Sequence, residues 1–401
     1  MLVQQQTASI VGAGPAGFAL AAGLQSQGTS VLVYSHPTHL RHANQVRRNG
    51  QLRASGVMQG SAHIRVTTDM AEAVAFSRIL FLTVPSTGQE TVLEELHRFS
   101  LRQHAIVAVP GNLFSLIAAD RLDAGCILET NLSPYSCRME EDGELRVLGK
   151  KELVFIAALR PEEGGEKEER EEEDLVRQAL CEEVARVLSP MRLKWCSSVV
   201  EVSLANVNGV FHPLMMLMNA GRIESTEGDF MLYADGLTPS VASAMEAVDR
   251  VRMQIGDALG LPVDTAVGVS NECYGQAFPD FVELARHSPP HNRLRAPPSL
   301  ENRNLSEDVP DLLVSWCGLA EKLGVDASPL RAVITLAQMA TGVDYLATGR
   351  NMRRLGLEHL SREELIARFG PVAKNNKRQK QKQKQSAMAT SNHNTVEACR
   401  L

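Results

Sequence analysis

The chain has 401 residues, of which 44% are hydrophobic and 22% charged, and its formal net charge at pH 7 is −6. Since a single hydrophobic core stops growing at roughly 250–300 residues, this length predicts at least two domains. The apolar runs are too short or too interrupted to cross a bilayer, and the acidic balance argues against nucleic-acid binding. We therefore expect no nucleic-acid partner and no membrane partner.

The seven cysteines are scattered without CxxC pairs, which predicts reduced thiols in an intracellular compartment rather than disulfides or a zinc site. The N-terminus has no basic region of the kind that opens a secretory signal. A cytoplasmic protein is the first expectation. The closing tripeptide CRL (399–401) resembles a relaxed peroxisomal or glycosomal import signal, which is the alternative.

The first 160 residues alternate between strand-like and helix-like segments. We predict strands at residues 8–12, 30–34, 78–86, 104–112, 125–137 and 143–159. Helical patterns separate the first two runs and the next two, as in βαβ units. The expected fold of the first domain is therefore a Rossmann domain, which is an α/β domain with a doubly wound, mostly parallel sheet.

The second half of the chain carries helical spacing and no strand signal. A charge run over 160–175 predicts a solvated turn before an amphipathic helix, and its role is not assigned. We divide the chain into a dinucleotide-binding Rossmann domain (1–197), a mostly α-helical substrate domain (198–370) and a basic tail (371–401). The tail is too polar to form a core, so we expect it to be disordered; it is also basic enough for a nucleic-acid or membrane-surface arm.

A glycine-rich loop follows the first predicted strand and opens a helix. Gly12, Gly14 and Gly17 fit the pattern G-x-G-x-x-G, and Pro15 and Ala16 lie between them. In such a loop the first glycine permits the tight turn, the second lets the backbone approach a pyrophosphate, and the third lets helix and strand pack closely. We predict that this loop binds a dinucleotide.

The end of the second strand indicates which dinucleotide is bound. Ser35 and His36 stand where an Asp or Glu would accept hydrogen bonds from the ribose hydroxyls of NAD, and Arg41 follows nearby. A hydroxyl and a cation suit a 2′-phosphate, so NADP(H) is favoured and NAD(H) remains possible. His39 and His42 continue a histidine spacing, but no Cys, Asp or Glu accompanies them, so no metal site is expected.

His212 is the candidate catalytic residue. It lies in the apolar, helix-like run 206–225, on one face with Asn208 and Asn219. Pro213 follows it and lacks the N–H that a helix needs there, so we expect the helix to kink, restart or open. His212 is suited to general acid/base chemistry. The alternative is a buried histidine hydrogen-bonded to a neighbouring amide.

A carboxylate is needed to orient such a histidine and to stabilise its protonated form. The best candidate is Asp308, at the end of a Pro-rich loop over 287–304. Asp308 also precedes Val309 and Pro310, which is a frequent signal for the start of a helix, so capping a helix is an alternative or additional role for it. Both interpretations stand at this point.

Five blocks of sequence resemble the opine dehydrogenases, and most closely their bacterial carboxyethyl-norvaline type. They are NVNGVFHPLMMLMNAGRIES (206–225), YADGLTPSVASAMEAVDRVRMQI (233–255), ECYGQ (272–276), RNLSEDVPDLL (303–313) and LGVDASPLRAVITLAQMATGVDYLATGRNMRRLGL (323–357). The resemblance runs from about residue 8 to residue 360. It implies NAD(P)H-dependent reductive condensation of an L-amino acid with a 2-oxo acid such as pyruvate, and the reverse oxidation.

The resemblance also implies roles for individual residues. His212 becomes the acid/base and Asp308 its orienting partner, while Asn208 holds a substrate carboxylate or carbonyl. Arg303 contacts the cofactor pyrophosphate and helps the domains to close. Ser133 and Tyr135 border the substrate amine. Structural alternatives are a backbone-bonded amide for Asn208 and a surface cation for Arg303.

Two other functions compete with this one. A related NADP-dependent reductase of the ketopantoate reductase or glycerol-phosphate dehydrogenase kind would use a lysine, but the chain has none between Trp195 and Lys322. A non-catalytic dinucleotide sensor would have no need for the candidate residues of the helical domain. The expected partners are therefore two small molecules, an amino acid and a 2-oxo acid, bound by a monomer or a homodimer.

Overall fold

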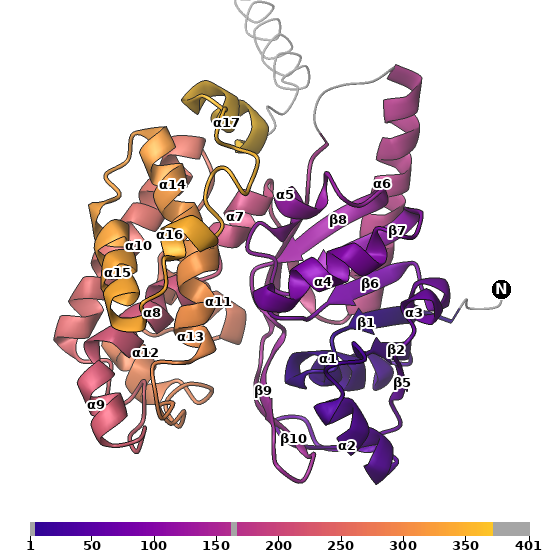
Figure 1. Cartoon of the computed structure of the whole chain (residues 1–401), viewed down its shortest axis with the longest axis horizontal. Helices are drawn as coiled ribbons and strands as arrows, with labels where there is room; N and C mark the ends of the chain where they lie inside the picture. The colour runs from indigo at the N-terminus through magenta and orange to yellow at the C-terminus, as the bar shows by residue number, and fades with distance from the viewer. Residues whose placement is uncertain (1–4, 162–166, 372–401) are drawn as a thin grey trace, which may run out of the picture.

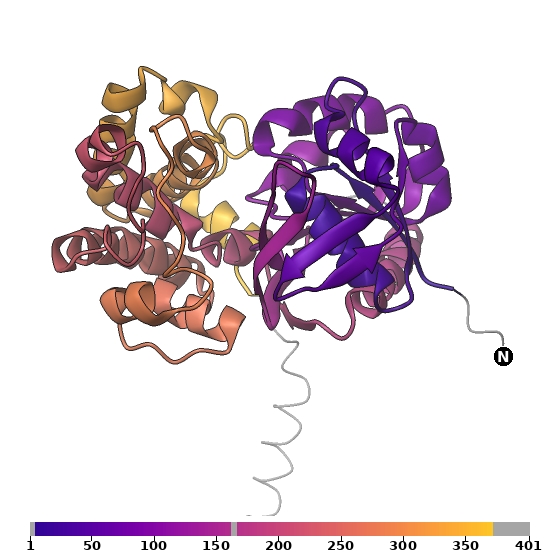
Figure 2. The same ribbon diagram turned by 90° about the horizontal axis from the view of Figure 1, so that it is seen from below.

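The structure is a computed structural model that describes residues 5–161 and 167–371. It comprises an α/β domain and a helical domain, which lie side by side in Figures 1 and 2. The predictions for residues 162–166 of the acidic run, for the tail after residue 371 and for the terminal tripeptide fall outside the described residues. Among the helices that are described, none combines the length and hydropathy needed to cross a membrane.

The first domain is built on an eight-stranded sheet. In spatial order its strands are β12 (Arg192–Trp195), β11 (Leu153–Ala158), β8 (Ala124–Thr130), β7 (Leu101–Ala108), β6 (Ile79–Leu82), β1 (Thr7–Val11), β2 (Ser30–Tyr34) and β5 (Arg65–Thr67). All neighbours pair in parallel except β11 and β8, which are antiparallel. This arrangement confirms the predicted doubly wound, mostly parallel sheet.

Helices cover both faces of this sheet. The helices of the domain are α1 (Pro15–Gln25), α2 (Arg41–Asn49), α3 (Met70–Phe76), α4 (Ser86–Leu96), α5 (Phe114–Ala118) and α6 (Lys167–Leu188). Apolar residues of α1 and α6 share one cluster with Ile10, whereas α3, α4 and α5 share another with Val11. Because successive side chains of a strand point to opposite faces, β1 is buried on both sides.

A second, four-stranded sheet was not predicted. Its order is β4 (Gly60–Ala62), β3 (Leu52–Gly56), β10 (Leu145–Lys150) and β9 (Tyr135–Met139). The predicted strands 125–137 and 143–159 each divide between the two sheets, because each contains a turn that sequence periodicity does not reveal. Figures 1 and 2 show the hairpin of β9 and β10 at the boundary with the helical domain.

The helices of the second half of the chain follow β12. They are α7 (Val199–Leu204), α8 (Asn208–Met218), α9 (Ala220–Ser225), α10 (Pro239–Leu259), α11 (Ala266–Tyr274), α12 (Phe281–His287), α13 (Arg303–Ser306), the π-helix η1 (Val309–Leu313), α14 (Val314–Leu323), α15 (Ser328–Thr341), α16 (Tyr345–Thr348) and α17 (Arg362–Phe369). Together with the sheet domain, they confirm the predicted fold class.

Two local expectations are corrected. Helix α6 begins at Lys167, inside the charge run expected to form a solvated turn, because Glu, Lys and Arg favour helix and acidic residues suit its first turns. Helix α8 continues through Pro213 from Asn208 to Met218, so of the expected kink, restart or opening, the restart and the opening do not occur. Pro213 lies early in this helix, and the apolar side chains that follow it are buried in the domain core, which holds the segment in one helix.

Candidate active site

The glycine loop after β1 has the geometry that a dinucleotide requires. Gly12 has a φ of +127°, and a Cβ there would lie 2.7 Å from Thr83 Oγ1. A Cβ on Gly17 would lie 1.9 Å from the carbonyl oxygen of Gly12, so both positions need glycine. A Cβ on Gly14 would meet nothing within 4 Å. Gly14 precedes α1, whose first turn has no side-chain cap and begins at Pro15, leaving its N–H groups for a pyrophosphate.

After the end of β2, Ser35 and His36, which were predicted to contact the ribose 2′-phosphate of the cofactor, already have partners within the protein. Ser35 is buried, and its Oγ donates a hydrogen bond of 3.1 Å to the carbonyl of His39. His36 Nε2 lies 3.5 Å from Glu95 Oε1, and the other carboxylate oxygen, Oε2, accepts a hydrogen bond of 2.5 Å from the hydroxyl of Tyr34. The sequence interpretation missed Glu95 because it comes from α4, far along the chain. Ser35 is therefore less free to bind a ligand than its position indicated.

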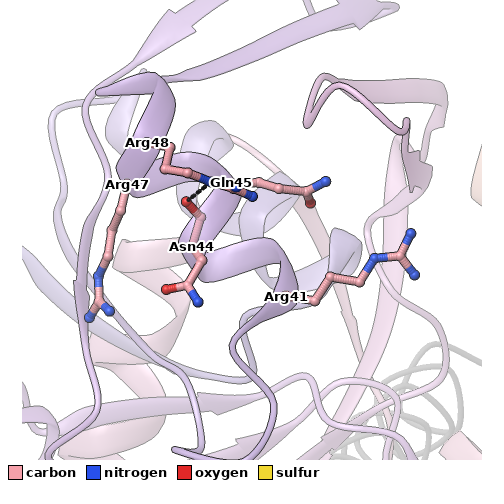
Figure 3. A pocket seen from close by; sticks show the side chains of 5 residues that line it. All are labelled: Arg41, Asn44, Gln45, Arg47 and Arg48. Atoms are coloured by element: carbon pink, nitrogen blue, oxygen red, sulfur yellow. Dashed lines mark hydrogen bonds between the residues drawn. The ribbon is translucent and has the colours of Figure 1, made fainter.

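Arginines of α2 lie next to this region and line a pocket of about 490 Å³ (Figure 3). The lining residues are Arg41, Asn44, Gln45, Arg47 and Arg48. Figure 3 shows Arg41 extending away from Arg47, and Arg48 Nε donates to the carbonyl of Asn44 at 3.3 Å. Arg41 is the first residue of α2 and is exposed. Arg47 Nη2 donates to the carbonyl of Val66 at 3.2 Å, so Arg41 has the guanidinium group of the three that is most available to an anion such as a phosphate.

His212 and Asp308 meet in the helical domain. His212 Nδ1 lies 2.6 Å from Asp308 Oδ2, although the two residues are 96 positions apart. Asp308 is 7% exposed and stands directly before η1, but its side chain makes no capping hydrogen bond there. The capping alternative is therefore wrong, and the carboxylate faces the imidazole instead. Because an ionised carboxylate only accepts hydrogen bonds, the proton of a neutral His212 ring belongs on Nδ1.

The other ring nitrogen of His212 faces a phenol. Nε2 lies 3.2 Å from the hydroxyl of Tyr233, a buried residue between α9 and α10. Burial raises the pKa of Tyr233, so its hydroxyl stays protonated and donates to Nε2. The polar partners of His212 are thus a carboxylate and a phenol rather than the neighbouring amide of the structural alternative. Tyr233 is the first residue of the 233–255 block that resembles the opine dehydrogenases, but its position in the sequence did not indicate a contact with His212.

A second histidine lies beside this pair. The ring of His291 lies 5.0 Å from that of Tyr233 and 5.1 Å from that of Tyr274, measured between centroids. Burial, together with the nearby charges of Lys151 and His212, lowers the pKa of His291 to about 3. His291 is therefore neutral at pH 7 and unable to serve as the proton donor.

Asn208 and Arg303 both lie at the starts of helices. Asn208 opens α8 one turn before His212, and among the described residues nothing hydrogen-bonds its side-chain amide. Arg303 opens α13 and is exposed. Burial raises the pKa of the Cys137 thiol to about 11, and the nearby positive charges of Lys151 and Arg303 act against this rise. Since Cys137 belongs to β9, Arg303 lies toward the first domain, as a residue that contacts the cofactor would.

Ser133 and Tyr135 do not join this group. Ser133 Oγ accepts a hydrogen bond of 3.5 Å from the backbone N–H of Tyr135. Tyr135 is 5% exposed and belongs to the core of the first domain, and a Cβ on Gly23 of α1 would lie 2.2 Å from its hydroxyl. Tyr135 therefore packs under the hairpin. The next residue, Ser136, faces the helical domain and lies 2.9 Å from the hydroxyl of Tyr274.

A buried arginine, Arg350, connects the two domains through contacts with residues of both. Arg350 Nη1 donates to the carbonyl of Gly111 at 2.7 Å, and Nη2 donates to Gln89 Oε1 at 2.5 Å. Its Nε lies 3.3 Å from Asp311 of η1, three residues after Asp308. Arg350 is 2% exposed. No sequence signal identified this contact, because its partners come from distant parts of the chain.

The sequence models of two protein families match the chain. The model described as "NAD/NADP octopine/nopaline dehydrogenase, alpha-helical domain" matches residues 195–341. The model described as "NAD-dependent glycerol-3-phosphate dehydrogenase N-terminus" matches residues 7–111. The first match contains His212 and Asp308, and the second contains the glycine loop.

Individual proteins match over nearly the whole chain. The opine dehydrogenase of Arthrobacter sp. (strain 1C) is 27% identical over 368 residues, covering 90% of this chain and 98% of that protein. Octopine dehydrogenase in complex with NADH and agmatine has a TM-score of 0.69 at 18% identity, covering 90% of this chain and 98% of that one. Yersinopine dehydrogenase with NADP⁺ bound has a TM-score of 0.65 at 15% identity, covering 90% and 99%. The two structural matches establish the shared fold.

Proposed function

This chain belongs to the opine dehydrogenase family, and from that premise we propose that His212, oriented by Asp308, is the acid/base of its reaction. The reaction is the NAD(P)H-dependent reductive condensation of an amino acid with a 2-oxo acid, and its oxidative reverse. The observation that carries the proposal is the contact of 2.6 Å between His212 Nδ1 and Asp308 Oδ2. It leaves Nε2 as the nitrogen that can exchange a proton with a substrate.

Each residue of the site has a separate role in this reaction. In the condensation, the amine nitrogen bonds to the carbonyl carbon, and the carbonyl oxygen leaves as water. His212, when protonated, donates its Nε2 proton to that oxygen, and the carboxylate of Asp308 stabilises the imidazolium. Tyr233 donates to the same nitrogen when the ring is neutral. Loss of water leaves an iminium ion, and the reduced dinucleotide, when bound, would supply the hydride that converts this ion to a secondary amine.

A direct assay tests this function. NADPH and NADH oxidation are followed with pyruvate over a panel of L-amino acids, and the product is identified by mass spectrometry. We expect oxidation that needs both co-substrates and a product joined through a secondary amine. Oxidation with the oxo acid alone would indicate a simple 2-oxo acid reductase instead. Failure with every oxo-acid and amino-acid pair would reject the proposal.

The reductase alternative has little support in the helical domain. The first lysine after Trp195 is Lys322, on α14. Its Nζ donates to the carbonyls of Glu358 and Leu360 at 2.7 and 2.9 Å. It is held there by backbone contacts rather than placed beside His212.

For the cofactor, we propose a preference for NADP(H), with Arg41 as a ligand of the 2′-phosphate. The support is the group of arginines on α2 and the absence of an acid at positions 35 and 36. Ser35 is a weaker candidate because its hydroxyl already bonds to His39. Glu95, beside His36, bonds to Tyr34, and its carboxylate would favour a ribose hydroxyl over a phosphate.

Replacing Arg41 by alanine is expected to raise the KM for NADPH about tenfold and to leave that for NADH within about twofold. A charge-assisted hydrogen bond to a phosphate of about 1.5–3 kcal/mol accounts for such a loss. Initial rates with each cofactor measure it. Arg102→Ala, at an exposed arginine on β7, is the matched control. An equal loss for both cofactors would remove Arg41 from the phosphate site.

Two further expectations remain proposals. We place the reaction in the cytoplasm and the protein as a monomer or homodimer. Size-exclusion chromatography with light scattering measures the oligomeric state. Fractionation of cells that express the chain with and without its last three residues tests the alternative compartment.

A further inference from the structure

Lys151 is a buried lysine at the boundary of the two domains, and it has no role in the reaction steps proposed above. It occupies the turn between β10 and β11 and is 5% exposed. Since β11 runs antiparallel to β8, with Ile156 opposite Thr130, the start of β11 lies beyond the carboxyl end of β8. The parallel strands that carry the glycine loop end at the same edge of the sheet. Lys151 therefore stands at the edge where such folds bind their ligands.

The ammonium group of Lys151 has no anionic partner in the part of the chain that the structure describes. Its Nζ lies 5.0 Å from the centroid of the Tyr274 ring, and no described carboxylate or hydrogen-bond acceptor pairs with it. The nearby thiols of Cys137 and Cys273 cannot neutralise the charge, because burial raises the pKa of each. The Nζ atom is not among the fully buried polar atoms that lack a partner, so the end of this otherwise buried side chain still reaches space that a ligand can enter. Lysines buried to this degree are usually paired with an anion.

A continuous row of side chains connects Lys151 with His212. Tyr274 lies against Lys151, and the ring of His291 follows it at 5.1 Å. The ring of Tyr233 comes next, 5.0 Å from His291, and its hydroxyl contacts His212 Nε2. The row crosses the domain boundary, and the bond of Ser136 to the Tyr274 hydroxyl holds it there. Lys151 and the proposed acid/base therefore lie at the two ends of one row of contacts, and the charges of both lower the pKa of His291, which lies between them.

We propose that Lys151 is the residue that binds a carboxylate of one of the two substrates. This inference rests on the proposed function, in which both the amino acid and the 2-oxo acid carry a carboxylate. An incoming carboxylate supplies the charge that the described protein groups do not, and Tyr274 holds the lysine side chain in place through its ring face. His291 is neutral and adds no competing charge. The carboxylate comes from the oxo acid or from the amino acid, and the kinetics of a variant distinguish them.

Lys151→Met tests the inference, because it removes the charge and keeps a chain of similar length. We expect the KM of either pyruvate or the amino acid to rise about 10- to 100-fold, with kcat and NADPH affinity little changed. The substrate whose KM rises identifies the carboxylate. Lys151→Arg, which keeps the charge, should restore most of the loss. Lys150→Met is the matched control, since Lys150 is the adjacent exposed lysine.

A ligand-binding measurement separates this inference from the proposed function. Pyruvate, and separately an amino acid, is added to the protein with NADP⁺, and the rise in Tm is compared between wild type and Lys151→Met. One of the two ligands should raise the Tm of the wild type and not that of the variant. This readout needs no turnover. Lys151→Gln, which keeps a polar end, replaces the methionine variant if the latter does not fold.

Three results would overturn the inference. Unchanged KM values and unchanged ligand-induced Tm shifts would show that Lys151 binds neither substrate. A fall in kcat alone would give Lys151 a part in proton transfer. A loss of Tm without ligand, not restored by arginine and without a selective change in KM, would make Lys151 an anchor between the domains.

Discussion

Replacing His212 by asparagine is expected to lower kcat about 10²- to 10⁴-fold, because general acid/base catalysis contributes that much. Asparagine has an amide nitrogen near the place of Nδ1, so it can still donate to Asp308, but it has no group that exchanges a proton at neutral pH. The binding of NADPH should not change, because its glycine loop lies in the other domain. Steady-state kinetics and a fluorescence titration with NADPH measure the two effects.

The control for this experiment is another histidine of the helical domain. His287 lies on α12, its side chain is 61% exposed and it pairs with Glu283, so His287→Asn should keep full activity. Retention of more than a tenth of wild-type kcat by His212→Asn would remove the histidine from the chemistry. A weaker binding of NADPH with kcat unchanged would give His212 a role in cofactor binding instead.

Replacing Arg350 by methionine is expected to lower the free energy of unfolding by about 3–5 kcal/mol. The change leaves the buried carboxylate of Asp311 without its cation, and it removes the hydrogen bonds to Gly111 and Gln89 across the domain boundary. Burial raises the pKa of Asp311, and the charge of Arg350 opposes that rise. Thermal and denaturant unfolding followed by circular dichroism measure the loss.

A second substitution shows whether the unpaired charge causes this loss. Removing both partners of a buried ion pair costs less than removing one, so Arg350→Met with Asp311→Leu should recover part of the stability. Arg353→Met, at an exposed arginine nearby, is the control and should stay within about 0.5 kcal/mol of wild type. A drop below about 1 kcal/mol for Arg350→Met would show that water or another group replaces the arginine.

Much of the first domain could be predicted because its signals are local. The glycine loop has a short, fixed spacing, and its steric reasons are visible in the structure, where Cβ atoms on Gly12 and Gly17 would clash. The main strands are apolar because they are buried on both faces. The second sheet could not be predicted, because its strands are short and partly exposed and because the pairing of β10 with β3, which joins its two hairpins, spans about 90 positions.

Only those parts of the candidate site that have a local sequence signal could be predicted. His212 stood out because an imidazole is unusual on an apolar helix, and the structure brings Asp308 to it. Tyr135 was assigned to the site by resemblance, but alternation along β9 turns its ring into the core and turns Ser136 outward. His291 lies in a loop without periodicity, so no pattern marked it.

The sequence by itself determined which residues can do chemistry: a loop that only glycine can form, a histidine on a helix, and a carboxylate that could either cap a helix or orient that histidine. The tertiary structure decided which of these meet. The contact between His212 and Asp308 spans 96 positions, and that between Arg350 and Gly111 spans 239. Such contacts depend on how helices and sheet pack against each other, and local propensities carry no information about distances between segments so far apart.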